Sequence, residues 1–219
     1  MMKKELKGKS EEVWLNLGCG VHLTEGFINV DNFFDRKDLE GKKGIYRDAT
    51  IDEGAEFVRA DICDLPFKDN YADYIETLDT VEHIGFFQIE KAFKEMYRVL
   101  KPGGKLGLMT TNFDQLAALW TLNIAGKSWD DSTFARFVSL SKVVYGNQAG
   151  PGEFHKIPFN PPFLMYLLMQ AGWKVENVKI SIHPMNTKEF PPVKSYGWGG
   201  WGDSNVLLTD MMWAECIKI

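Results

Sequence analysis

Residues 13–20 decide the fold, and they read Val-Trp-Leu-Asn-Leu-Gly-Cys-Gly. The mostly apolar run over residues 13–17 predicts a short buried strand. Gly18 and Gly20 then predict a tight turn in which the backbone is not covered by side chains. A strand that ends in such a turn is typical of an open α/β sheet, in which ligands bind beyond the carboxyl ends of the strands.

Strands alternate with helical stretches along the rest of the chain. Apolar runs predict strands over residues 27–30, 56–60, 71–77 and 105–110, and a closing pair over residues 174–182 and 205–219. Apolar residues at helical spacing predict helices over residues 88–100, 115–124, 132–145 and 162–171. The segment Lys101-Pro102-Gly103-Gly104 is interpreted as the stop signal of the first of these helices. The pattern predicts an α/β doubly wound fold, with a seven-stranded, mostly parallel sheet and an antiparallel terminal strand.

The connection between the first two predicted strands is unusually short. Only residues 18–26 separate them, whereas a parallel crossover normally needs a dozen or more residues that include a helix. Either the first helix has shrunk to a turn, or residues 27–31 pair in a different way. We adopt the shortened first helix.

Length and charge limit the remaining possibilities. A chain of 219 residues with 45% hydrophobic and 25% charged residues is long enough for one well-buried core, so we expect a single domain over residues 1–219. The formal net charge of −5 makes a nucleic-acid partner unlikely on electrostatic grounds. Four lysines near the N-terminus are interpreted as a solvated arm: Lys3, Lys4, Lys7 and Lys9.

Targeting signals and cysteines favour a cytoplasmic protein. The N-terminal lysines are not followed by the apolar stretch of a signal peptide. No apolar run approaches the roughly 20 residues that a membrane span needs, so no membrane partner is expected. The three cysteines, Cys19, Cys63 and Cys216, lack metal-ligand spacing, and we expect them to be reduced thiols.

Residues 15–20, Leu-Asn-Leu-Gly-Cys-Gly, resemble the first motif of the class I S-adenosylmethionine-dependent methyltransferases, which have a Rossmann-like fold. Three further features follow in the order of that family: Asp31 after the second strand, Asp-Ile-Cys-Asp-Leu-Pro-Phe at residues 61–67, and Tyr-Arg-Val-Leu-Lys-Pro-Gly-Gly at residues 97–104. The resemblance covers about residues 13–112. Residues 26–31, Gly-Phe-Ile-Asn-Val-Asp, resemble a type 11-like subgroup of small methyltransferases linked to surface-glycan or secondary-metabolite modification.

The resemblance implies S-adenosylmethionine as the cofactor and a cofactor-binding core over residues 13–112. It implies that Asp31 accepts hydrogen bonds from the ribose hydroxyls, and that Asp61 and the amide of Ile62 bind the adenine. The other implied contacts, to the methionine part and the reactive methyl group, come from Asn16, Gly18, Cys19, Gly20, Leu78 and Asp79. Asn16 stands where the family commonly has an acidic residue, and His22 where a third glycine is usual, so the contacts to the amino group stay open.

A base near the methyl group would help an oxygen or nitrogen acceptor to react. The first candidate for a catalytic residue is His155, in the loop Gly152-Glu153-Phe154-His155-Lys156 before the last helix, and the second is His83. A structural or solvated role is the alternative for a lone loop histidine. We expect a small-molecule or saccharide acceptor, recognised by residues 113–162 and 183–204 as substrate-binding or lid insertions.

Asp79, Glu82 and His83 would share one face if a helix began near Asp79. We interpret Glu82 and His83 as packing or capping residues and predict no metal. The alternative is a divalent ion, because a similar acidic-x-x-Glu-His run holds one in some ubiquinone-pathway and small-RNA methyltransferases.

Two other functions stay open at this point. One is a nicotinamide-dependent oxidoreductase, although the short first crossover leaves little room for the helix that binds a pyrophosphate. The other is a catalytically silent cofactor-binding module. The glycine-interleaved aromatic run Tyr196-Gly197-Trp198-Gly199-Gly200-Trp201 could present rings to a sugar, a flat metabolite or a partner subunit.

Overall fold

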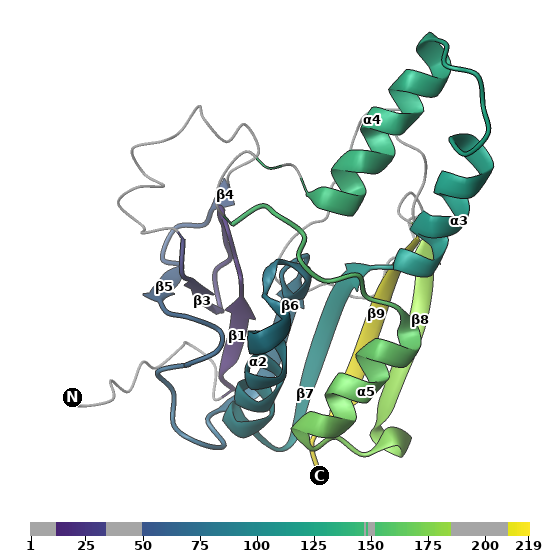
Figure 1. Ribbon diagram of the computed structural model, residues 1–219. Helices are drawn as coiled ribbons and strands as arrows, with labels where there is room; N and C mark the ends of the chain where they lie inside the picture. Colours follow the sequence, from purple (N-terminus) through teal and green to yellow (C-terminus); the bar gives the residue numbers. More distant parts are fainter. Residues whose placement is uncertain (1–11, 34–49, 147, 149–151, 185–209) are drawn as a thin grey trace.

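A computed structural model describes residues 12–33, 50–146, 148, 152–184 and 210–219. Its centre is a seven-stranded sheet in the order β5-β3-β1-β6-β7-β9-β8 (Figure 1). The strands are β1 (Trp14–Leu17), β3 (Ile28–Asp31), β5 (Glu56–Arg59), β6 (Ala72–Leu78), β7 (Leu100–Thr111), β8 (Val178–Pro184) and β9 (Asp210–Ile217). β9 is antiparallel to both of its neighbours, and the other neighbouring pairs are parallel. The predicted mostly parallel sheet with an antiparallel terminal strand is confirmed.

The central strands are apolar because layers of side chains cover them. Five of their side chains are at most 1% exposed to solvent: Leu15, Leu17, Ile75, Leu106 and Leu108. Strands buried on both faces need apolar residues at successive positions and not only at alternate ones. This requirement explains why short apolar runs located the strands in the sequence.

The first crossover is reduced to turns and the two-residue strand β2 (His22–Leu23), which pairs with β4 (Thr50–Ile51) in a separate small sheet. β3 still pairs with β1 in parallel, so the shortened connection that we adopted is confirmed. The buried amide of Asn29 holds this connection together. Its Nδ2 donates to the carbonyl oxygens of Thr24 and Glu56 (both 3.0 Å), and its Oδ1 accepts from Thr24 N (3.1 Å) and Asn16 Nδ2 (3.0 Å).

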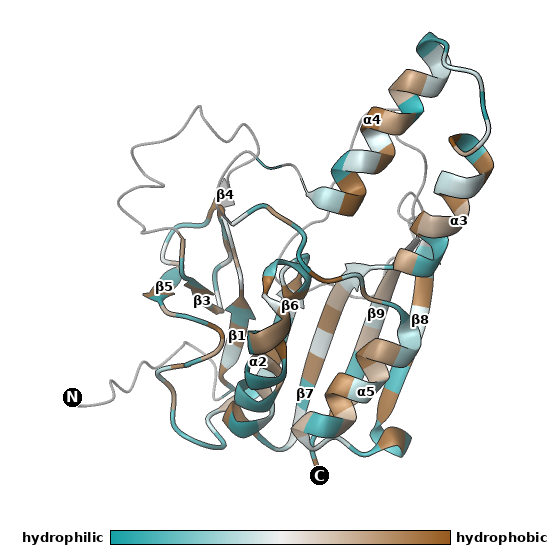
Figure 2. Cartoon of the chain, viewed as in Figure 1, coloured by the Kyte–Doolittle hydropathy of each residue, from teal (hydrophilic) through white to brown (hydrophobic). Residues whose placement is uncertain are grey.

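Two helices, α2 (Phe86–Val99) and α5 (Pro161–Ala171), lie side by side on one face of the sheet (Figure 1). α2 buries a stripe of side chains at helical spacing, which includes Ile89, Phe93 and Met96. In Figure 2 this helix carries hydrophilic residues on the side turned to the viewer, whereas β7 and β9, to its right in this view, are mainly white to brown. The helix is therefore amphipathic, as its sequence pattern predicted.

The stop signal at residues 101–104 is confirmed, because α2 ends at Val99. The predicted strand over residues 105–110 begins earlier than expected, since β7 starts at Leu100 and includes the Pro-Gly-Gly segment. This segment pairs with the last residues of the chain, because Gly103 N donates to Lys218 O (2.6 Å) and Lys218 N to Gly104 O (3.0 Å). The partner strand is distant in sequence, and local turn signals could not reveal it.

α3 (Phe113–Asn123) and α4 (Asp131–Tyr145) pack against each other and project beyond the ends of the strands (Figure 1). Leu116, Ile124 and Leu140 form their small buried cluster. Near the C-terminus the predicted strand over residues 174–182 begins too early, because a 3-10 turn, η2 (Val175–Asn177), precedes β8. For the last predicted strand, residues 205–209 lie outside the described residues, and β9 covers Asp210–Ile217. The N-terminal lysines and the aromatic run at residues 196–201 lie outside the described residues. Among the described helices, none is both long and apolar enough to cross a membrane.

Candidate functional site

The carboxyl ends of four neighbouring parallel strands form one edge of the sheet. The strands β5, β3, β1 and β6 are adjacent, and their registers align Leu17 with Val30 and Thr77, and Val30 with Val58. The residues that end or directly follow these strands therefore lie along the same edge. They are Asp61 after β5, Asp31 in β3, Gly18 after β1, and Leu78 and Asp79 at the end of β6.

The turn after β1 folds back onto β3. The amides of Gly18 and Cys19 both donate to Val30 O, at 2.8 and 3.1 Å, and the amide of Gly20 donates to Oδ2 of Asp31 (3.0 Å). Gly18 and Gly20 have φ angles of 71° and 54°, in the left-handed region that favours glycine. The buried carboxylate of Asp31 also accepts from the amide of Phe33 (Oδ1, 2.7 Å). Asp31 thus fixes the turn in addition to any ligand that it binds.

Two residues that were predicted to contact a cofactor, Asn16 and Cys19, have buried side chains that contact other parts of the protein. Asn16 is buried, and its amide donates to Oδ1 of Asn29. Cys19 packs into a small apolar cluster with Val21, Leu23 and Ala55, and burial raises the pKa of its thiol far above the ordinary value. The backbone of Cys19 is part of the turn, whereas its side chain is buried below it. All three cysteines are buried and free, as expected for reduced thiols.

The loop after β5 is attached to α2 by an ionic cluster that sequence analysis missed. Within the loop, Oδ1 of Asp61 accepts from Cys63 N (2.8 Å). Glu95 accepts from the amide of Leu65 (2.9 Å), and Arg98 donates to the carbonyl oxygens of Phe67 (2.8 Å) and Leu65 (3.1 Å). Glu95 and Arg98 also form an ion pair at 2.7 Å. Their i, i+3 spacing on the helix was the available signal.

The end of β6 holds a strained acidic residue. Asp79 has a φ angle of 46°, which a side chain larger than glycine adopts only at a cost. Its amide donates to Met109 O (3.1 Å), but its buried Oδ1 accepts no hydrogen bond from any residue that the structure describes. Burial and then the nearby Glu82 raise the pKa of Asp79 well above the usual range. Leu78 packs against Met109, Met211 and Trp213.

Glu82 lies in a 3-10 turn, η1 (Val81–His83), and not in a helix that begins near Asp79. It is completely buried. Its Oε2 accepts from the hydroxyl of Thr110 (2.9 Å), whereas no described residue donates to its Oε1. Burial raises the pKa of Glu82 to about 7, because removal from water disfavours the charged form. Carboxylates of this kind, buried and half-satisfied, mark candidate functional sites.

His83 and His155, although distant in sequence, lie side by side. Their ring centroids are 4.7 Å apart. Nδ1 of His83 donates to Phe154 O (3.1 Å), and the amide of Lys156 donates to Glu82 O (2.7 Å), so the loop before α5 is attached to η1. Burial and then the nearby His155 lower the pKa of His83 to about 4, and burial also lowers that of His155. Both imidazoles are therefore neutral at pH 7.

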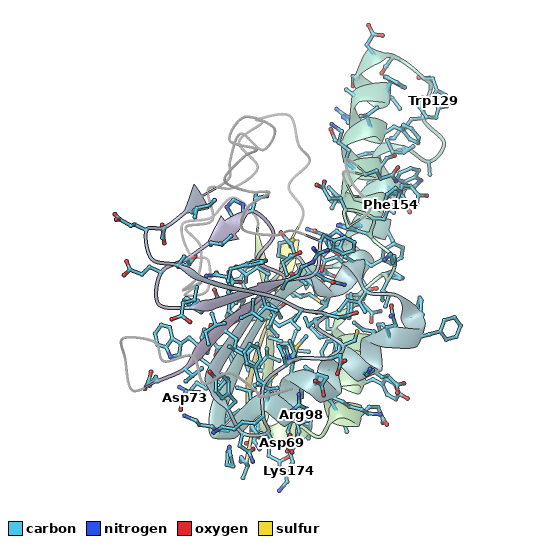
Figure 3. The ribbon with its side chains drawn as sticks, turned by 90° about the vertical axis from the view of Figure 1, so that its left-hand side faces the viewer. Asp69, Asp73, Arg98, Trp129, Phe154 and Lys174 are labelled. Carbon is cyan, nitrogen blue, oxygen red and sulfur yellow. The ribbon has the colours of Figure 1, made fainter. Side chains whose placement is uncertain are left out.

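This histidine pair belongs to the same end of the molecule as the strand edge. Figure 3 shows Phe154 near the base of the α3–α4 hairpin, at the end of the sheet opposite to Asp69, Asp73 and Arg98. The chain order explains the position, because η1 directly follows β6 and Thr80 contacts Gly18. The two candidate catalytic histidines are thus brought together, and His83 lies beside the backbone of Asp79.

Comparisons with known proteins show which proteins this chain is similar to. Residues 15–108 match the family described as a methyltransferase domain. An uncharacterized protein of Methanocaldococcus jannaschii is 26% identical over 190 residues, which cover 83% of this chain and 76% of that protein. The ubiquinone/menaquinone biosynthesis C-methyltransferase UbiE of Brucella canis is 30% identical over 115 residues, which cover 50% of this chain and 40% of that enzyme. The chain thus matches less than half the length of this curated enzyme.

A solved structure covers nearly the whole chain. The S-adenosylmethionine-dependent methyltransferase of Methanosarcina mazei superimposes with a TM-score of 0.58 over 96% of this chain and 94% of that one, at 15% identity. At this identity the likeness concerns the fold. The superposition covers more of the chain than residues 15–108, to which the family match is confined.

Proposed function

We propose that this chain is a class I S-adenosylmethionine-dependent methyltransferase, and that it methylates an oxygen or nitrogen atom of a small-molecule or glycan-type acceptor. The observation that carries the proposal is the meeting of Gly18, Asp31, Asp61 and Asp79 at the carboxyl ends of four adjacent parallel strands. In open α/β sheets this edge is where ligands bind.

The groups at this edge fit the cofactor. Gly18 and Gly20 leave the backbone of the turn uncovered, and Asp31 presents a carboxylate that two backbone amides hold in place. The buried Oδ1 of Asp79, which has no donor among the described residues, suits a ligand that carries positive charge. S-adenosylmethionine has such a charge on its sulfur and, when bound, supplies an activated methyl group.

Residues of this chain would then orient the two reactants. We assign the ribose hydroxyls to Asp31, the adenine to Asp61 and the amide of Ile62, and the methionine part to the turn at residues 18–20. Leu78 and Asp79 would lie near the methyl group. Alignment of acceptor and methyl group can supply much of the rate acceleration of such a displacement.

The proton of an oxygen or nitrogen acceptor must go to a base. His155 and His83 are our candidates, since both are neutral at pH 7, their rings lie side by side, and His83 lies beside the backbone of Asp79. The projecting hairpin of α3 and α4 would contribute acceptor specificity. Its exposed aromatic side chains include Trp129 and Phe134.

A nicotinamide cofactor fits this edge less well. The pyrophosphate of a dinucleotide binds the N-terminus of the helix after the first strand. Residues 18–27, all of them described, form turns and the short strand β2 in place of that helix. The methyltransferase function is therefore the one that the local structure supports.

The test is methyl transfer from radiolabelled S-adenosylmethionine to a panel of monosaccharides, phenols and amines. We expect label in at least one acceptor class, and a loss of about 100-fold or more in the rate for His155→Asn, the range typical of a missing base. Lys174→Asn is the control, because Lys174 is an exposed residue at the opposite end of the sheet (Figure 3). Cofactor binding without transfer to any acceptor would indicate a silent binding module instead.

A further inference from the structure

Three side chains near the end of β6 have the donor atoms and spacing of a metal site. One carboxylate oxygen of Glu82 and one ring nitrogen each of His83 and His155 all lie within 4.8 Å of one another. They come from two segments of the chain, η1 and the loop before α5, which backbone hydrogen bonds hold together. We propose that Glu82, His83 and His155 bind one divalent transition-metal ion.

The buried carboxylates supply an independent argument. Glu82 is completely buried, and its Oε1 has no donor among the described residues. Oδ1 of Asp79 is also buried and has no donor among the described residues. The carboxyl groups of Asp79 and Glu82 lie close enough to interact. Two neighbouring buried carboxylates are costly when no cation accompanies them. A bound cation compensates both groups at once and gives the unused oxygen of Glu82 a partner.

The histidines are also oriented as metal ligands usually are. A ligating imidazole normally donates its other N–H to a carbonyl or carboxylate, which fixes the ring. Nδ1 of His83 donates to Phe154 O, which leaves the lone pair of Nε2 for a ligand. The ring of His155 likewise donates a hydrogen bond to the backbone carbonyl of Val143.

The donor set selects the class of ion. Two imidazoles and one carboxylate suit Zn²⁺, Co²⁺, Mn²⁺ or Fe²⁺, whereas Mg²⁺ and Ca²⁺ prefer sites made of oxygen ligands. Three protein ligands also leave coordination positions for water or for an oxygen atom of another molecule. In the metal-loaded protein the histidine lone pairs would serve the ion, so the histidines would act as the base only in the metal-free protein. A hydroxyl bound to the ion would be more acidic and would release its proton to solvent water.

The site can be tested without cofactor or acceptor, so its failure would be distinct from failure of the proposed methyl transfer. The protein is first treated with a chelator and then titrated with Co²⁺, whose visible absorption reports coordination, followed by Zn²⁺ as a competitor. We expect one ion per chain, displacement by Zn²⁺, and no displacement by an equal concentration of Mg²⁺. Absence of a saturable Co²⁺ spectrum would overturn the proposal.

Variants identify the ligands. His83→Ala, His155→Ala and the isosteric Glu82→Gln should each weaken Co²⁺ binding at least about 10-fold, the effect expected even for a residue that only supports a ligand. His183→Ala should bind as the wild type does. Because a substitution at a buried position can unfold the protein, each variant is also melted with and without Zn²⁺. The ion should raise the Tm of the wild type and the control only, and an equal rise in folded ligand variants would contradict the assignment.

Discussion

The side chain of Thr80 lies directly against the α-carbon of Gly18, so the end of β6 touches the turn after β1. A Cβ atom added at Gly18 would overlap Oγ1 and Cγ2 of Thr80. Thr80 is itself fixed, because its hydroxyl donates to Leu78 O (2.8 Å). The glycine therefore allows two strand ends to approach each other at the edge where we place the cofactor.

Gly18→Ala should be destabilising for two reasons, the overlap with Thr80 and the φ angle of 71°. We expect a loss of at least about 2 kcal/mol in the free energy of unfolding, the scale of overpacking combined with backbone strain. Gly20→Ala is the matched control, since its φ is 54° and an added Cβ would meet nothing within 4 Å. Urea unfolding measures both variants, and equal losses would refute the role of the Gly18–Thr80 contact.

Asn29→Ala should destabilise the shortened first crossover. Asn29 is completely buried, and its removal leaves the amide and carbonyl of Thr24 and the carbonyl of Glu56 without this partner. Unsatisfied buried polar groups cost about 1–3 kcal/mol each, so we expect a total loss of about 3 kcal/mol. Asn160→Ala, which removes the N-cap bond to Phe163 N (3.0 Å) and an exposed hydrogen bond to Oδ1 of Asp114 (3.1 Å), should cost about 1 kcal/mol. A smaller loss at Asn29 than at Asn160, again from urea unfolding, would contradict this account.

Glu95→Gln should change how stability depends on pH. Hydrogen bonds from Arg98 are the main cause that lowers the pKa of Glu95 below its ordinary value of 4.5. A carboxyl group with a lowered pKa in the folded state stabilises the protein above its ordinary pKa, and this contribution is lost as the pH falls. The wild type should therefore be more stable than Glu95→Gln at pH 7, with a difference that shrinks towards pH 3.5. Thermal unfolding of both proteins at pH 7 and pH 3.5 measures this difference in stability. A difference that grows in acid would contradict the assigned role of the ionic cluster.

Much of the sheet could be predicted from the sequence because its central strands β1, β3 and β6 are mostly buried and appear as apolar runs. The residues after those strands were equally accessible, since Gly18, Asp31, Asp61 and Asp79 each follow or end such a run. Features that depend on contacts between residues distant in sequence could not be predicted. The pairing of residues 103–104 with Lys218 and the contact of His83 with His155 depend on the tertiary fold, and no local pattern encodes them.

Short elements and buried polar contacts were also missed. β2 and β4 have two residues each, too few for a detectable alternation. In the sequence Asn29 is a single polar residue in an apolar strand. In the structure its amide holds the shortened crossover by hydrogen bonds to Thr24, Glu56 and Asn16. The face shared by Asp79, Glu82 and His83 was expected from helical geometry, and the 3-10 turn at residues 81–83 places them differently.

The central claim is that the strand edge binds S-adenosylmethionine through Asp31. Isothermal titration calorimetry with this nucleoside, on the wild type and on Asp31→Ala, tests it most directly. Asp52→Ala is the matched control, because that carboxylate also holds a turn amide, Glu25 N at 3.0 Å, but lies outside the edge. We predict one site per chain, a Kd at least about 10-fold higher in Asp31→Ala, and an unchanged Kd in the control. No heat with the wild type, or equal affinity in Asp31→Ala, would contradict the claim.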